Sequence, residues 1–140
     1  MDDPKTQDLL SSLNNTDIDT HLKLIDGKYP LTIQAYFNEI IAKRQLKAAD
    51  IIRKSGQSDN YMHQVLNGTK TKPSRDKLIA LCIGAELNLE ETQRALEIGK
   101  VGILYAKSKR DSVMIYAINN KLKMRDVNGL LEKYGAATIE

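Results

Sequence analysis

A run of polar side chains between residues 58 and 64 contains the residue types that recognise nucleic-acid bases. Asn and Gln amides can pair bidentately with adenine, Asp can accept from cytosine, and Ser or Tyr can bond to bases or phosphates. The candidates for reading bases are Ser58, Asp59, Asn60, Tyr61, His63 and Gln64. A second set is suited to holding phosphates and consists of Lys43, Arg44, Lys47, Asn67, Lys70 and Lys72. For His63 the alternative is a merely exposed polar residue.

Positive charge is concentrated around these candidates. Residues 43–77 contain nine Lys and Arg against three Asp, a net charge of +6, although the whole chain carries only +3. Residues 1–30 are acidic, with six Asp against three Lys. Such segregation is what an electrostatic footprint for nucleic acid requires. A solvated basic face without a partner would give the same counts, so charge alone leaves both readings open.

Helices must position these side chains, because apolar residues recur at helical spacing and no run alternates as a strand would. The sequence therefore predicts an all-α protein. Thr32 is a suitable cap for a first helix that runs to about Arg44. A second helix is expected over about 47–54, with Ala49, Ile51 and Ile52 facing inward.

Gly56 should end the second helix, because Gly tolerates the positive φ of a helix end. Ser58 is expected to cap a third helix, which stops at residues 67–68. After a basic loop, Ser74 should cap a fourth helix with a strongly apolar sequence.

This layout resembles the lambda-repressor-like family of helix-turn-helix proteins, of the Cro/cI or XRE type, over roughly residues 32–87. The resemblance is carried by the run DIIRKSG at 50–56, the helix start at Ser58, the closing Leu-Asn-Gly at 66–68 and the Leu-Ile-Ala-Leu pattern of the fourth helix. It implies a five-helix domain that places its third helix in the major groove, often within a dimer on a two-fold DNA site.

The resemblance leads us to expect a sequence-specific regulator of transcription that binds double-stranded DNA. We expect a homodimeric repressor in the cytoplasm of a bacterium or encoded by a phage. The expected division is an acidic N-terminal appendage at 1–30, a helix-turn-helix domain at 31–88 and a helical C-terminal extension at 89–140. The extension would serve dimerisation or bind an acidic or protein partner.

A rival hypothesis is a protein-interaction adaptor that keeps the helix-turn-helix scaffold without binding DNA. Ala48 stands where many family members offer Gln to a phosphate, and Asp59 places negative charge near the expected DNA backbone. A third hypothesis joins the two, with the acidic residues 1–30 occupying the basic face. It predicts that deletion of residues 1–28 tightens DNA binding.

The C-terminal half contains an approximate repeat at an offset of 35 residues, which predicts two consecutive helical hairpins. The identical pairs are Arg75/Arg110, Asp76/Asp111, Ile83/Ile118, Leu87/Leu122, Leu96/Leu131 and Glu97/Glu132. Amphipathic helices of similar length also align by chance, so coincidence remains the alternative. Seven apolar residues here favour either an interface or a buried core, namely Val113, Ile115, Tyr116, Ile118, Leu130, Leu131 and Tyr134.

Ser108 and Asp111 have the spacing of a capping box. The basic residues Lys107, Lys109 and Arg110 beside them could also hold an acidic partner.

Other chemistry has little support in the sequence. One Cys excludes an internal disulfide, and Cys82 lies in an apolar run that indicates a buried thiol. His21 and His63 lack ligand-rich neighbours, so we expect no metal site. Nucleotide-binding and hydrolase motifs are absent, so we expect no enzyme and no cofactor. No membrane span or leader is evident, which suits a cytoplasmic protein.

Overall fold

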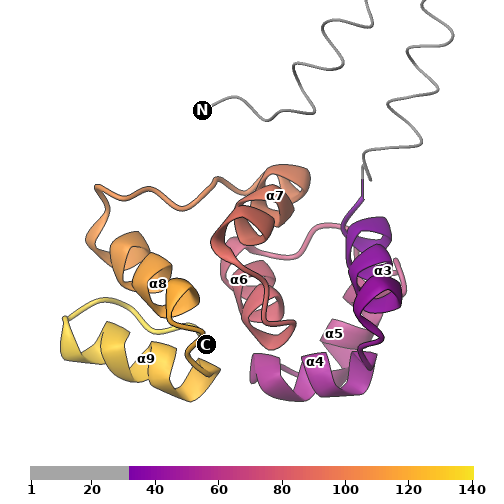
Figure 1. The fold of residues 1–140 in the computed structure, drawn as a ribbon, viewed down its shortest axis with the longest axis horizontal. Coiled ribbons are helices and arrows are strands. Elements are labelled where there is room, and N and C mark those ends of the chain that lie inside the picture. Colours follow the sequence, from indigo (N-terminus) through magenta and orange to yellow (C-terminus); the bar gives the residue numbers. More distant parts are fainter. Residues whose placement is uncertain (1–31) are drawn as a thin grey trace, which may run out of the picture. The chain divides into compact units, whose positions relative to one another are not determined.

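Seven α-helices make up residues 32–140, the part of the chain that this computed structural model describes (Figure 1). They are α3 (Ile33–Arg44), α4 (Ala48–Ser55), α5 (Asp59–Leu66), α6 (Arg75–Gly84), α7 (Leu89–Gly99), α8 (Lys109–Asn119) and α9 (Met124–Lys133). Strands are absent from these residues, so the predicted all-α class is confirmed for them. The expected acidic appendage lies outside the described residues.

Capping side chains fix the starts of α3 and α6. The Thr32 hydroxyl accepts a hydrogen bond from the Ala35 N–H at 3.0 Å, and the Ser74 hydroxyl accepts one from the Lys77 N–H at 3.3 Å. Both predicted caps are confirmed. Ser58 does occupy the N-cap position of α5, but its side chain makes no capping hydrogen bond, so that part of the expectation is wrong.

The short helix α4 crosses α6 with the two backbones in contact. A Cβ atom added at Gly84 would lie 2.3 Å from the Ile51 carbonyl oxygen and 2.9 Å from the Ser55 nitrogen. Only Gly permits this approach, because any side chain would separate the helices. Ile51 and Ile52 are buried as expected, whereas Ala49 is exposed, which corrects its expected inward orientation.

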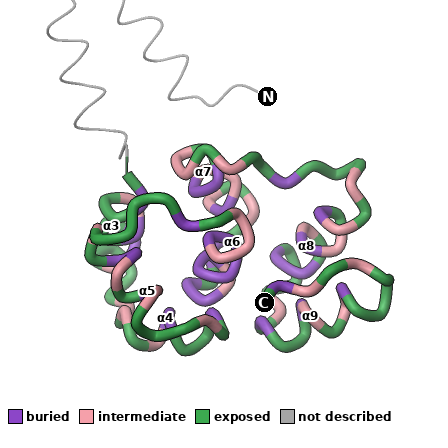
Figure 2. The backbone as a smooth tube through the Cα atoms, turned by 180° about the vertical axis from the view of Figure 1, so that it is seen from behind, coloured by how far each residue is buried: buried purple, intermediate pink, exposed green. Residues whose placement is uncertain are grey.

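Helix α6 lies at the centre of the core. Its residues 78–82 are completely buried, and Figure 2 shows this concentration of buried positions between α3–α5 on one side and α8–α9 on the other. Helix α6 therefore lies between the three N-terminal helices and the hairpin formed by α8 and α9.

The hairpins α6–α7 and α8–α9 share the same turn, 35 residues apart. Glu86 and Lys121 are both left-handed, with φ of 57° and 53°. The Leu87 N–H donates to the Cys82 carbonyl at 3.1 Å, and the Leu122 N–H donates to the Ala117 carbonyl at 3.0 Å. Each turn thus satisfies a carbonyl left free at the end of its helix.

The repeat continues beyond the helices into an extended segment that follows each hairpin. The Gln93 side-chain amide bonds to both the N–H and the carbonyl of Leu104, at 2.7 and 2.9 Å. The Asn128 amide does the same to Ile139, at 2.8 and 3.0 Å, again 35 residues on. Chance alignment of amphipathic helices predicts no such correspondence outside the helices, so the repeat is a structural one.

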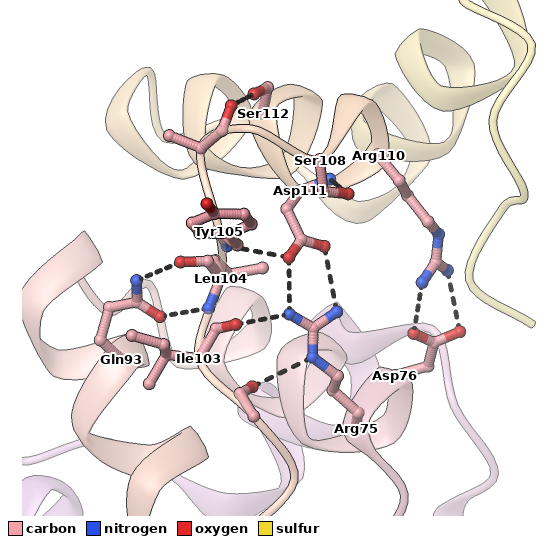
Figure 3. A network of polar contacts seen from close by, with 12 residues as sticks. Arg75, Asp76, Gln93, Ile103, Leu104, Tyr105, Ser108, Arg110, Asp111 and Ser112 are labelled. Atoms are coloured by element: carbon pink, nitrogen blue, oxygen red, sulfur yellow. Dashed lines mark hydrogen bonds and ion pairs between the residues drawn. The ribbon is translucent and has the colours of Figure 1, made fainter.

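Two reciprocal ion pairs join the hairpins (Figure 3). Arg75, at the start of α6, makes a bidentate pair with Asp111 of α8, with distances of 3.0 and 2.7 Å. Arg110 of α8 makes the equivalent pair with Asp76 of α6, at 2.9 and 2.8 Å. Each hairpin therefore presents the same Arg-Asp dipeptide to the other, as in the self-complementary interface of a two-fold dimer.

The contacts of Asp111 differ from those of the capping box expected at the start of α8. The Ser108 hydroxyl accepts from the Asp111 N–H at 3.3 Å, as predicted. The Asp111 carboxylate does not return this bond; it accepts instead from Arg75 and from the Tyr105 N–H at 2.9 Å. The hydrogen bonds from Arg75 hold the pKa of this buried carboxyl below its ordinary value.

Candidate functional site

The candidate base-reading residues lie on α5, which a short turn joins to α4. Gly56, with φ of 69°, ends α4, and residues 56–58 make up the whole connection. The inner face of α5 buries Met62, Val65 and Leu66 against the core. This packing fixes the rotation of α5 about its axis, and hence which side chains face outward.

The outer face of α5 brings together most of the predicted base-reading residues. Asp59, Asn60 and His63 are exposed, and Gln64 is half-buried. Asn60 and Gln64 are four residues apart, so their amides are neighbours on the helix surface. The exposed Ser58 stands immediately before them. The helix therefore presents two amides and an imidazole on one surface.

Tyr61 is held against α6 rather than directed outward with the others. The Lys77 ammonium lies 5.1 Å from the centre of its ring and also donates to the Gln57 side-chain carbonyl at 3.0 Å. Tyr61 is half-buried in this position.

A hollow of about 440 Å³ lies between α4 and α5. Asp50, Asp59 and Arg53 are the charged residues in its lining, and Arg53 pairs with Asp50 at 3.2 Å. Two carboxylates against one guanidinium make this hollow unsuitable for a phosphate. Phosphate contacts must therefore come from residues outside this hollow. Arg53 was not among the predicted site residues, because its side chain reaches this hollow only when α4 and α5 are packed together.

Three of the six predicted phosphate ligands have other partners. Lys43 pairs with Glu39 at 3.0 Å on the exposed side of α3. Arg44 pairs with Glu91, which also caps α7. The Asn67 side-chain carbonyl accepts from the Thr69 N–H at 2.9 Å, and so shapes the loop after α5.

The other three predicted phosphate ligands are free cations. Lys47, Lys70 and Lys72 are exposed and form no ion pair within the part of the chain that the structure describes. The Lys70 N–H donates to the Gln64 carbonyl at 3.0 Å, which ties the loop directly to α5. Lys47 stands at the N-cap position of α4. Unpaired positive charge is thus present on the loop that follows α5, at Lys70 and Lys72, and at the start of α4, at Lys47.

The remaining titratable groups of interest are structural. Burial raises the pKa of the Cys82 thiol, which lies completely inside the core, as predicted. Burial likewise raises the pKa of the Tyr36 hydroxyl, which donates to the Glu91 carbonyl at 2.9 Å. Among residues 32–140, His, Cys, Asp and Glu side chains nowhere gather in a group that could hold a metal ion.

Within these same residues, the helices are too short or too polar to cross a membrane. No protein-family model, no curated protein and no solved structure matches this chain.

Proposed function

We propose that this chain is a sequence-specific regulator of transcription that binds double-stranded DNA as a homodimer and acts as a repressor. In this proposal α4 and α5 form the helix-turn-helix of a lambda-repressor-like domain, and α5 enters the major groove. The observation that carries the proposal is the outer face of α5. Asn60, His63 and Gln64 lie there together, and the loop that follows α5 carries Lys70 and Lys72 without ion-pair partners. Lys47, at the start of α4, also has no ion-pair partner among the described residues.

The two sets of side chains would have different roles. Asn60 and Gln64 can each offer a donor and an acceptor to the edge of adenine, and such contacts distinguish sequences. The three lysines can neutralise phosphates of any sequence, and they supply affinity through the release of counterions. Each neutralised phosphate contributes a slope of about −0.9 to the dependence of log K on log salt. Three free lysines therefore predict a slope of about −3 per protomer.

The proposed homodimer requires a contact surface on each copy of the chain. Tyr116 and Tyr134 are 59% and 49% exposed. Ile118 and Leu131 are buried, so part of the expected C-terminal apolar surface belongs to the core instead. The exposed tyrosines, and not the whole apolar set, are the candidates for a dimer contact.

A salt titration against a pool of random duplex DNA, followed by sequencing of the bound fraction, tests the proposal. Asn60→Ala with Gln64→Ala should leave the salt slope intact and abolish sequence enrichment. Lys70→Glu with Lys72→Glu should reduce the slope by about two. The control is Lys107→Glu with Lys109→Glu, which makes the same change of charge at the start of α8, in the opposite half of the structure (Figure 1).

Failure of the native chain to bind DNA at low salt, even after deletion of residues 1–28, would reject the regulator and leave the adaptor hypothesis. Equal slopes for the two lysine pairs would reject the assignment of phosphate contacts to the loop after α5. Tighter binding after the deletion alone would support a competitive role for the acidic residues.

A further inference from the structure

The turns of both C-terminal hairpins, together with the end of α4, line one groove. Its volume is about 630 Å³, within the range of about 300–1,000 Å³ found for ligand sites. Ile83 and Leu87 from the first turn, and the equivalent Ile118 and Leu122 from the second, all contribute to it. The groove therefore lies where the two copies of the repeat meet, and it shares Arg53 with the hollow between α4 and α5.

The floor of this groove is apolar. Leu87, Ile118 and Met124 are buried, while Ile83 and Leu122 are half-buried and remain in reach of a partner. A sugar-phosphate backbone gains little from such a floor. An amphipathic peptide gains more, because it can place apolar side chains on the floor at helical spacing.

The rim of the groove is strongly basic. It carries five cations, Arg53, Lys54, Lys121, Lys123 and Arg125, against the single acid Glu86. Three of these cations are paired, Lys54 with Glu86 at 3.6 Å, Arg53 with Asp50 at 3.2 Å and Arg125 with Asp126 at 3.9 Å. Lys121 and Lys123 are exposed and form no ion pair with any residue in the range 32–140. The groove thus combines an apolar floor with unneutralised positive charge.

We propose that this groove binds an acidic amphipathic segment of a partner protein. The apolar side chains of the segment would cover Ile83 and Leu122, and its carboxylates would meet Lys121 and Lys123. This docking site goes beyond DNA binding and does not depend on it. It also differs from the basic residues 107–110, where Arg110 is already paired with Asp76.

Fluorescence anisotropy with the full chain tests the groove. The probe is a fluorescein-labelled peptide of about 16 residues, with Leu at helical positions i, i+3, i+4 and i+7 and Glu elsewhere. We expect saturable binding that Lys121→Glu with Lys123→Glu weakens about tenfold. Both lysines are exposed, so the substitutions leave the core intact, and far-UV circular dichroism verifies this. Lys107→Glu with Lys109→Glu is the charge-matched control and should leave binding within about twofold.

Three results would overturn the proposal. Equal binding of a scrambled peptide of the same composition would show attraction by charge alone, without use of the apolar floor. Loss of random duplex DNA binding in the Lys121 and Lys123 variant, with peptide binding unchanged, would assign the groove to nucleic acid. Loss of peptide binding in the Lys107 and Lys109 control, but not in the Lys121 and Lys123 variant, would place the acidic partner at the start of α8.

Discussion

Replacement of Asp111 by Asn tests the ion pairs that join the hairpins. The substitution keeps the shape of the side chain but removes its charge and turns one oxygen into a donor. Asp111 accepts three hydrogen bonds, two from Arg75 and one from the Tyr105 N–H, and its side chain is only 7% exposed. The new donor must face the guanidinium of Arg75 or the N–H of Tyr105, so a bond is replaced by a repulsion.

The structure supports a magnitude for this loss. Hydrogen bonds to charged groups contribute about 1.5–3 kcal/mol each, and the amide retains one acceptor. We expect Asp111→Asn to lower the free energy of unfolding by about 2–3 kcal/mol. Asp76→Asn is the matched control in the equivalent pair. The Asp76 side chain is 36% exposed, so solvent screening reduces its expected cost to about 1 kcal/mol or less.

Urea unfolding of the full chain, followed by circular dichroism at several pH values, measures both variants. Because the folded pKa of Asp111 is lowered, its contribution is fully present above the ordinary carboxyl pKa of about 3.9. The contribution disappears as the pH falls through the folded pKa, so the wild-type chain and Asp111→Asn should converge in acid. Equal losses in the two variants at pH 7, or a gap that does not change with pH, would refute this reasoning.

Two further predictions concern the core. Gly84→Ala should lower the free energy of unfolding by more than about 3 kcal/mol, because its Cβ would collide with the α4 backbone. Gly129→Ala, in α9 with open space around it, should instead raise the free energy of unfolding by about 0.5–1 kcal/mol. Urea unfolding measures both variants, and similar effects at the two sites would contradict the close crossing of α4 and α6. Cys82 should react with a thiol reagent at pH 8 only as the chain unfolds, because burial excludes the reagent and raises the pKa of the thiol. Rapid labelling of the native chain would contradict its buried position.

Local signals in the sequence were sufficient to predict most of the helices. Thr32 and Ser74 are capping residues whose function depends on the next turn of the chain, and the structure shows their predicted bonds. Gly56 likewise marks the end of α4 through its own backbone conformation. The repeat could also be predicted, because identical residues recur in the sequence at an offset of 35 positions.

Contacts between distant segments could not be predicted in this way. Asp111 has the right spacing to cap with Ser108, but Arg75, which is 36 positions away, binds its carboxylate more strongly than a backbone N–H can. Arg44 looked available for a phosphate because its partner Glu91 is distant in sequence. The requirement for Gly at position 84 likewise depends on the crossing with α4, which no local pattern indicates.

The reciprocal Arg-Asp pairs have a consequence for how the hairpins recognise each other. A self-complementary contact does not distinguish the second hairpin of the same molecule from the second hairpin of another copy. The choice is made by the short connection 100–108, which keeps the two partners at a high effective concentration, of order millimolar for short linkers. Covalent connection, rather than the interface itself, therefore keeps each first hairpin with its own second hairpin, and it opposes the exchange of hairpins between molecules.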